Sequence, residues 1–350
     1  MKQILKQVAG IDVSQKELVV SLGRMYHDLA TEIYAFKVFS NSAKGFLALT
    51  TWIKKLTDQV LEIRFVMEAT GVYHEALVFY LDDKGFAVSV VLPNKISNYY
   101  RTLQVKTVTD KTASEVIAQF GLERNLDKWK RPKEIYKRLR QLTRERDQIV
   151  AERTTVKNQL HAENSEAEPN KTSITRINKR IKLLNGQEKE VQAEIAQLIR
   201  KDTEVSKKVA IIKTLPGVGL LTAAIVLAET NGFELIRNKR QLTSYAGLDV
   251  SEKQSGTSVK GKPRIPKKGN KHLRKAMHLP ALAAIRCDDR YSAIFTRLVS
   301  KHGIKMKASV AIQRKLLELI YILFNSSQPY DKQYLTKFDN TLSTASALPN

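Results

Sequence analysis

The hydrophobic periodicity of the chain changes near residue 131, and this change constrains the fold more than any other feature. Before that point, short β-rich runs alternate with amphipathic helical runs. After it, apolar residues recur three or four positions apart over long stretches, which is typical of long helices. We therefore expect four parts along the chain: an α/β domain at 1–130, a helical segment at 131–205, a basic and mostly helical domain at 206–327, and a polar tail at 328–350.

The first 130 residues predict a mixed sheet with helices packed on it. The expected strands are 7–13, 17–22, 32–40, 62–68 and 86–92, and the expected helices are 42–56 and 73–82. A polar turn between the first two runs indicates a hairpin. A meander of strands followed by alternating helices and strands is the element order of an RNase-H-like domain.

The segment 131–205 carries two heptad-like series of apolar residues. The first comprises Ile135, Leu139, Leu142, Ile149, Val156 and Leu160, and the second Ile174, Ile177, Ile181, Leu184, Val191, Ile195 and Leu198. A polar break with Pro169 separates them. This pattern predicts two antiparallel helices joined by residues 161–172, forming a coiled-coil arm that would serve dimerisation. The alternative is that both helices pack on a globular body.

The third region opens with a glycine hairpin, Leu215-Pro216-Gly217-Val218-Gly219, followed by an apolar helical run over 220–229. Backbone N–H groups at a helix N-terminus attract anions, so Gly217 and Gly219 are candidates to hold a DNA phosphate in a helix-hairpin-helix. Any tight turn is the alternative interpretation. Packing helices are expected at 281–285 and 310–323, before the polar tail.

The charge of the chain indicates a polyanionic partner. The formal net charge is +24, of which residues 206–350 contribute +16, residues 131–205 +5 and residues 1–130 +3. Nine bases and no acid occur between Lys253 and Lys275. Such blocks favour nucleic acid, whose counterions are released on binding, over a merely soluble basic face.

The remaining composition excludes several classes. Cys287 is the only cysteine, so an intrachain disulfide and a thiolate zinc site are excluded. The six histidines are scattered, and no apolar stretch reaches the length of a membrane span, about 18 residues. We therefore expect a soluble cytoplasmic protein that does not associate with a membrane.

Three acids are candidates for a metal site that acts on phosphodiesters. Asp12 lies in the first strand run, Glu68 ends a buried strand, and Asp110 begins a helix. Taken singly, they also fit a turn residue, a solvated strand end and a helix N-cap. Strand ends direct acids into one crevice, where a few carboxylates hold Mg²⁺ or Mn²⁺ with water.

Together these residues carry a family resemblance. Gly10-Ile11-Asp12-Val13-Ser14, Met67-Glu68-Ala69-Thr70-Gly71, Lys106-Thr107-Val108-Thr109-Asp110, Ser255-Gly256 and Lys268-Gly269-Asn270-Lys271-His272-Leu273-Arg274 resemble insertion-sequence-110 type DEDD transposases, the bridge-RNA-guided recombinases. The resemblance spans roughly residues 7–325. It implies a RuvC-like domain with an Asp, Glu, Asp, Asp tetrad, a coiled coil, and a C-terminal domain that supplies a serine. It also implies a structured guide RNA, target and donor duplex DNA, and a tetramer built as a dimer of dimers.

The fourth acid of the family pattern is absent, because position 113 is alanine. Asp110 and an acid at 113 would share one helix face and one cation. Glu115 points elsewhere, about 200° further round the helix than Ala113. Either a natural variant tolerates three acids, or the residue was substituted to trap a substrate complex; we favour the second. The chain is then expected to bind its substrates and cleave them poorly.

The resemblance assigns the nucleophile to Ser255, which would form a covalent phosphoserine link to DNA. A hydroxyl needs a base or a metal to activate it. Ser258 is an alternative nucleophile, and from composition alone either serine is an ordinary loop residue. The glycines Gly256 and Gly261 permit close approach of the backbone. The candidate phosphate-binding residues are Lys260, Lys262, Arg264, Lys267, Lys268, Lys271 and Arg274, with Arg274 suited to a bidentate clamp.

Tyr99, Tyr100 and Arg101 form an aromatic and basic group that is suited to stacking on RNA or on single-stranded bases. Ordinary helix packing is the alternative for the tyrosines. Two rival functions also fit the sequence. One is a Holliday-junction resolvase or other metal nuclease with water as its nucleophile, and the other is a catalytically silent scaffold for RNA and DNA.

Overall fold

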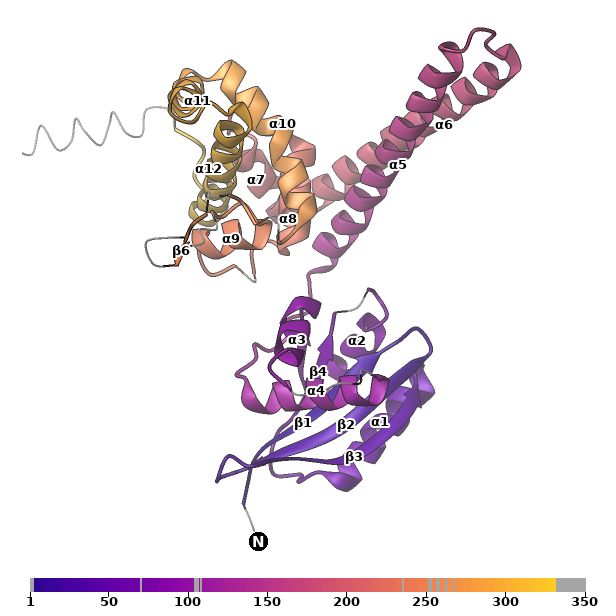
Figure 1. Ribbon diagram of the computed structural model, residues 1–350, viewed down its shortest axis with the longest axis vertical. Helices are drawn as coiled ribbons and strands as arrows, with labels where there is room; N and C mark the ends of the chain where they lie inside the picture. Colours follow the sequence, from indigo (N-terminus) through magenta and orange to yellow (C-terminus); the bar gives the residue numbers. More distant parts are fainter. Residues whose placement is uncertain are drawn as a thin grey trace, which may run out of the picture. The chain divides into compact units, whose positions relative to one another are not determined.

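The computed structural model describes residues 3–69, 71–103, 107, 109–234, 236–250, 254–255, 259–261, 264–266 and 268–331. The chain divides into two compact units, Met1–Arg131 and Pro132–Asn350, and each is treated by itself (Figure 1). The first unit is an α/β layer structure, and the described part of the second is mainly helical, with one short hairpin.

A five-stranded mixed sheet forms the first unit, in the order β3-β2-β1-β4-β5. Strands β1 (Ile4–Val13), β2 (Glu17–Tyr26) and β3 (Thr31–Ser40) form an antiparallel meander, whereas β4 (Ile63–Glu68) and β5 (Ala87–Val91) continue the sheet parallel to β1. The predicted mixed sheet is therefore confirmed. Its strand order and directions are those of an RNase-H-like domain.

Helices cover both faces of this sheet. Leu49 of α1 (Ala43–Leu56) and Leu77 of α2 (Glu75–Asp83) pack on one face, and α3 (Pro93–Tyr100) and α4 (Asp110–Glu123) cover the other. Successive residues of a strand point to opposite faces. In β4, Phe65 and Met67 accordingly enter the first core and Val66 the second, which explains why the central strands read as continuous apolar runs.

The second unit begins with a long helical hairpin, α5 (Glu134–Asn164) and α6 (Lys171–Lys201). The two helices lie along each other, and their far end extends beyond the rest of the unit (Figure 1). Val156, Ile177 and Leu184 form a small core between them there. The predicted pair of helices thus has its own apolar contact, while its supercoiling remains a prediction.

A helical body completes the second unit. It comprises α7 (Thr203–Ile212), α8 (Leu220–Thr230), α9 (Lys239–Ala246), α10 (Lys271–Cys287), α11 (Asp289–His302) and α12 (Lys305–Ser326). Residues Ala223 to Thr230 of α8 are all buried, so α8 is the central helix. Leu139 and Ile195 at the base of the hairpin enter the same core, which makes the hairpin and the body one compact unit.

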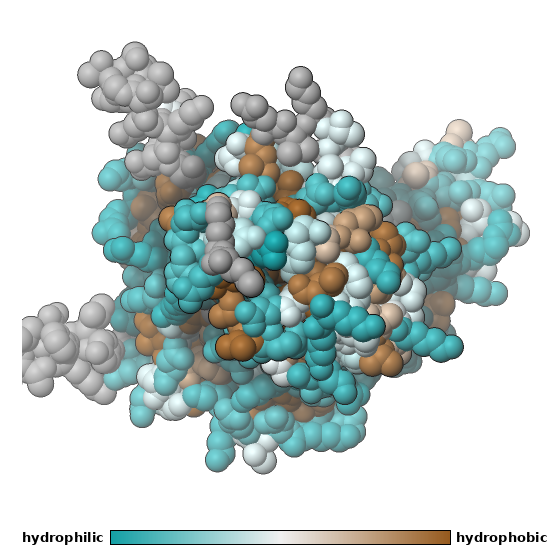
Figure 2. Space-filling model, turned by 90° about the horizontal axis from the view of Figure 1, so that it is seen from below, coloured by the Kyte–Doolittle hydropathy of each residue, from teal (hydrophilic) through white to brown (hydrophobic). Residues whose placement is uncertain are grey.

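The surface is polar. Hydrophilic side chains cover most of the face drawn in Figure 2, with hydrophobic ones in small separate groups. None of the helices in the described part of the chain combines the length and apolar character that crossing a bilayer requires.

Candidate functional site

Two of the three predicted acids lie side by side at one edge of the sheet. Strand β1 runs parallel to β4 with Ile11 opposite Met67, so the next residues, Asp12 and Glu68, emerge together at the carboxyl ends of the strands. Both side chains are partly exposed. Ligands in open α/β sheets bind outside these carboxyl ends, which makes this edge a candidate active site.

The third acid is brought to this edge by the close packing of α4 on β1. A Cβ atom at Gly10 would lie 2.2 Å from the Ala118 nitrogen and 2.4 Å from the Ser114 oxygen, so the strand and helix backbones nearly touch there. Asp12 points to the same face of β1 as Gly10, two residues further along. Asp110 lies one turn, about 5.4 Å, before Ser114 on α4. Because Gly10 has no side chain, α4 can pack closely on β1, and this packing places Asp110 on the same side of the sheet as Asp12.

Electrostatics support this convergence. Burial raises the pKa of Asp12, and the negative charges of Asp110 and Glu68 raise it further, against a lowering hydrogen bond from the Val13 backbone. Three carboxylates on separate elements therefore repel one another at one place. Mutually repelling carboxylates of this kind are an environment that a divalent cation stabilises.

The side chains as placed do not form a closed coordination set. Within the described residues, no three His, Cys, Asp or Glu side chains lie close enough together to ligate one ion. The oxygen donors suit Mg²⁺ or Mn²⁺ in type and charge. Asp12, Glu68 and Asp110 are therefore candidates to hold a divalent cation.

Position 113 lies in the first turns of α4. Thr109 is the N-cap, and its side chain accepts a hydrogen bond from the Thr112 nitrogen at 3.2 Å. Asp110 is thus the first helical residue and not the N-cap that its sequence context allowed. Ala113 is partly buried, and Glu115 lies 3.9 Å from Lys111 in an ion pair on the same helix.

An open groove of about 670 Å³ adjoins Glu68, and α3 forms its other wall. Its lining residues are Glu68, Pro93, Asn94, Ile96, Ser97, Tyr100, Arg101 and Leu103. Burial raises the pKa of the Tyr100 hydroxyl, and the negative charges of Asp12 and Glu68 raise it further. The volume is within the ~300–1,000 Å³ of small-molecule pockets, which also suits one nucleotide.

The prediction that Tyr99 contacts nucleic acid is wrong. Tyr99 is 5% exposed and packs edge-on against Phe120, with the ring centroids 5.2 Å apart. Helix packing, the alternative interpretation, therefore holds for Tyr99, whereas Tyr100 and Arg101 line the groove. Sequence reasoning missed Asn94 and Ser97; Pro93 at the first position of α3 is the signal that would have placed them on a helix.

Ser255 lies in the second unit, on a two-stranded hairpin. Strand β6 (Gln254–Ser255) pairs antiparallel with β7 (Val259–Lys260), and Ser255 is opposite Val259. The side chains of Ser255 and Lys260, and the residues Gly256, Ser258, Lys262 and Lys267, lie outside what the structure describes. Gly261, Arg264, Lys268 and Lys271 are exposed, as phosphate-binding or closely approached positions require.

The C-terminal end of this basic segment is anchored at the start of α10. Asn270 caps the helix by accepting hydrogen bonds from the His272 and Leu273 nitrogens, and it donates to Glu229 Oε2 at 2.7 Å. Glu229 is 3% exposed and also accepts two hydrogen bonds from Arg144. Burial alone raises the pKa of Glu229, but these hydrogen bonds bring it below its usual range.

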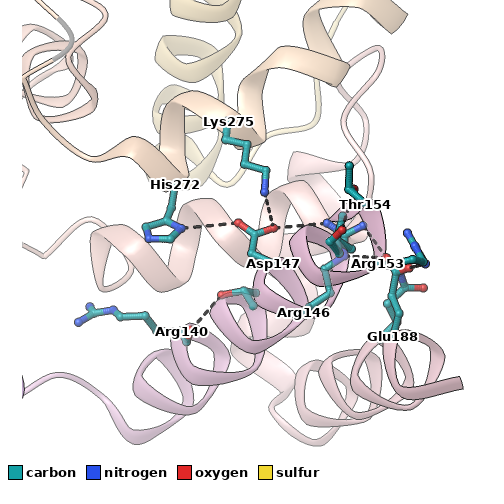
Figure 3. Close-up of polar contacts among 11 residues, drawn as sticks. Arg140, Arg146, Asp147, Arg153, Thr154, Glu188, His272 and Lys275 are labelled. Carbon is teal, nitrogen blue, oxygen red and sulfur yellow. Dashed lines mark hydrogen bonds and ion pairs between the residues drawn. The ribbon is translucent and has the colours of Figure 1, made fainter. Parts of the chain in front are cut away.

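A residue near the base of the α5–α6 hairpin also contacts the start of α10. Asp147 lies 3.3 Å from Lys275 Nζ and 3.6 Å from His272 Nδ1, so α5 and α10 are linked by charge (Figure 3). Also on α5, Arg146 and Arg153 pair with Glu188 of α6. Hydrogen bonds and ion pairs therefore link the α5–α6 hairpin to the start of α10, which follows the segment that carries Ser255.

Two further predicted phosphate ligands have structural roles. Arg274 Nη1 donates to the Ala246 carbonyl at 2.7 Å and closes the end of α9, so one edge of the expected phosphate clamp is already engaged. A Cβ at Gly217, where φ is +78°, would lie 2.4 Å from the Pro280 carbonyl. Gly217 is thus required for packing on α10, whereas Gly219 is exposed at the start of α8, with no heavy atom within 4 Å of an added Cβ.

An RNase-H-like sheet with carboxylates at its strand ends defines a nuclease-type domain, a class that generally uses divalent metal ions. Comparison with known proteins specifies the family. A profile described as "Transposase" matches residues 9–163, and one described as "Transposase IS116/IS110/IS902 family" matches residues 209–296. This chain belongs to the IS110 family of transposases.

Named relatives agree with this assignment. The chain is 29% identical over 306 residues to the pilin gene-inverting protein of Moraxella bovis, covering 84% of this chain and 90% of that protein. It is 28% identical over 123 residues to an IS110 protein of Streptomyces coelicolor, covering 35% of this chain and 30% of that one. Among solved structures, Thermus thermophilus RuvC in complex with a Holliday junction is 10% identical with a TM-score of 0.27, covering 35% of this chain and 99% of RuvC.

Proposed function

We propose that this transposase is an RNA-guided DNA recombinase that uses Ser255 as its nucleophile, assisted by a divalent cation at Asp12, Glu68 and Asp110. The proposal is supported by the position of Asp12 and Glu68 at the ends of adjacent parallel strands, with Asp110 on α4; burial raises the pKa of Asp12, and the charges of Asp110 and Glu68 raise it further. A mutually repelling set of this kind is stabilised by a cation and destabilised without one.

In the proposed reaction the Ser255 oxygen attacks a DNA phosphorus atom. A bond forms between the serine oxygen and phosphorus, the bond from phosphorus to a deoxyribose oxygen breaks, and that oxygen receives a proton. The phosphoserine link keeps the energy of the broken bond, so a hydroxyl of another strand can reverse the step and rejoin the DNA. A bound divalent cation supplies charge neutralisation at the phosphate.

The basic segment around Ser255 is proposed to hold the DNA backbone. Lys260, Lys262, Arg264, Lys267, Lys268 and Lys271 would neutralise phosphates, with Gly219 at the start of α8 as a further contact. The anchoring of Asn270 on buried Glu229 supports this role, because it fixes the end of a segment that must be placed accurately. Arg274 would contribute through its remaining N–H groups.

The guide RNA is proposed to contact the groove beside Glu68. Tyr100 offers an aromatic face and Arg101 a planar cation, which together bind unpaired nucleotides without base specificity. Sequence choice would then rest with base pairing between guide and DNA. The α5–α6 hairpin is proposed as the coiled-coil arm that joins copies into a tetramer, with Leu183, 61% exposed on α6, as an apolar contact.

Ala113 is proposed to weaken cleavage while leaving binding intact. Position 113 is one helical turn from Asp110 and is partly buried beside the acids. An aspartate there would add a fourth carboxylate to the set. Ala113→Asp is therefore expected to increase metal-dependent strand cleavage by a factor of ten or more, on the order of the ten- to hundredfold effect of altering a metal site.

One assay tests the proposal. The Ala113→Asp chain, with its co-purified RNA and Mg²⁺, is incubated with labelled duplex DNA from the region that flanks its own gene. A denaturant-stable protein–DNA adduct that is lost in Ser255→Ala and retained in Ser258→Ala is the expected result. Cleavage without an adduct would instead indicate a nuclease that uses water. Binding without cleavage would indicate a scaffold.

A further inference from the structure

The connection between α11 and α12 presents a basic surface that lies outside the segment expected to bind DNA. Every residue over 300–307 is exposed, and three of them are lysines: Lys301, Lys305 and Lys307. None of the three makes an ion pair with any residue that the structure describes. This surface begins beyond residue 296, where the matched transposase profile ends.

The charge on this surface is of one sign. Residues 290–317 contain seven Lys or Arg and no Asp or Glu. Along the sequence, the nearest acids are Asp289 at the start of α11 and Glu318 in the second half of α12, each about 20 Å from the connection at 1.5 Å per residue. Glu318 is already paired with Arg314 at 3.0 Å. The connection therefore carries uncompensated positive charge into solvent.

This arrangement opposes local stability. Lys305 and Lys307 lie in the first turn of α12, where the helix dipole disfavours cations. Arg297 and Lys301 are four residues apart on α11, so like charges adjoin on one helix face. Charges that weaken the fold in isolation are expected where a polyanion compensates them.

Two apolar side chains project among the lysines. Ile304 is 47% exposed and Met306 59% exposed. The backbone beneath them is fixed, because Gly303 ends α11 in a left-handed conformation and Ala308 and Ile312 are buried in the core. A firm turn with projecting Ile and Met between cations has the composition of side chains that enter the minor groove of DNA and unstack a base step.

We infer that the α11–α12 connection binds duplex DNA independently of sequence. Lys301, Lys305 and Lys307 contact phosphates on the two sides of the minor groove, and Ile304 and Met306 lie against the groove floor. The surface adds a second DNA contact to the proposed recombinase and involves neither Ser255 nor the acids. DNA binding by this surface can therefore be measured separately from strand cleavage, so a negative result for one does not decide the other.

The test compares the full chain with a triple variant, Lys301→Ala with Lys305→Ala and Lys307→Ala. Affinity for a short duplex is measured by fluorescence anisotropy in EDTA over a range of salt concentrations. Each lost phosphate contact lowers the slope of log affinity against log salt by about 0.9, so the slope should fall by about 2 to 3. At physiological salt this corresponds to a loss of roughly tenfold to a hundredfold.

The matched control removes three exposed lysines from the first unit: Lys54, Lys55 and Lys84. It changes the net charge equally and is expected to leave the slope nearly unchanged. The Lys301 triple variant should also unfold at the same or a higher temperature, because like charges have been removed. Equal slopes in the two triple variants, or a loss restricted to structured RNA, would overturn the inference.

A second variant, Ile304→Ser with Met306→Ser, tests the apolar contact. It should keep the salt slope of the parent chain and abolish bending of a duplex labelled at both ends for energy transfer. Bending equal to that of the parent would overturn the role of these two side chains.

Discussion

The contact between Asn270 and Glu229 yields a prediction with a magnitude. Asn270→Ala removes the N-cap of α10, which costs about 1 kcal/mol. It also removes a 2.7 Å hydrogen bond to a carboxylate that is 3% exposed, and hydrogen bonds to charged groups contribute about 1.5–3 kcal/mol. We expect the free energy of unfolding of the second unit to fall by about 2.5–4 kcal/mol.

The matched control is Asn238→Ala at the start of α9. Asn238 caps its helix through the Gln241 nitrogen at 2.9 Å and donates to no buried carboxylate among the described residues, so about 1 kcal/mol should be lost. Urea unfolding followed by far-ultraviolet circular dichroism reports on the helical second unit. Both tryptophans, Trp52 and Trp129, lie in the first unit, so their fluorescence should keep its midpoint in either variant.

If Asn270→Ala lowers the free energy of unfolding no more than Asn238→Ala does, the hydrogen bond to Glu229 contributes nothing and the prediction is wrong. A shift of the tryptophan midpoint would show that the effect is not confined to the second unit. With a urea dependence of ~2 kcal/mol per molar, the expected shift of the circular-dichroism midpoint is about 1–2 M.

Three further predictions concern the first unit, the first of them with a matched control in α6 of the second unit. Gly10→Ala should destabilise the first unit by about 3 kcal/mol or more, because the new Cβ would lie 2.2 Å from the Ala118 backbone. Gly186→Ala is the control: it has open space around it and should stabilise α6 by about 0.5–1 kcal/mol. The urea midpoint of each unit measures these changes. The raised pKa of Asp12 means that its contribution to stability is complete below about pH 4 and is lost as the pH rises through that pKa. Asp12→Asn should therefore raise the tryptophan-monitored midpoint at pH 7 in EDTA, and a midpoint that is equal or lower would contradict the repulsion. Arg101→Ala should weaken binding of single-stranded RNA severalfold in an anisotropy titration, and an unchanged affinity would remove the groove from the account.

The sheet, and the positions of Asp12 and Glu68 at the ends of two of its strands, were largely predictable from the sequence, because local patterns determine them. Strand β4 was expected at 62–68 and is found at Ile63–Glu68, and α1 was expected at 42–56 and is found at Ala43–Leu56 with Ser42 as its cap. Period-2 and period-3.6 patterns report which face is buried, and a capping serine marks where a helix begins.

Other features depend on tertiary contacts that no local pattern reports. A packing helix was predicted at 281–285, but α10 runs from Lys271 to Cys287 with Pro280 buried inside it, and the Pro280 carbonyl lies against Gly217. Gly217 is needed for this packing, and the sequence alone does not distinguish such a glycine from one that binds a phosphate. Tyr99 and Tyr100 are indistinguishable by composition, yet the rotation of α3 buries one against Phe120 and turns the other to the groove.

The binding of one divalent cation by Asp12, Glu68 and Asp110 is the central claim, and titration of the full chain with Mn²⁺, followed by electron paramagnetic resonance, tests it most directly. The account predicts one site whose dissociation constant rises about tenfold or more in each of Asp12→Asn, Glu68→Gln and Asp110→Asn, and stays unchanged in the control Glu115→Gln. Mn²⁺ affinity that is the same in all four variants and the parent chain would contradict it.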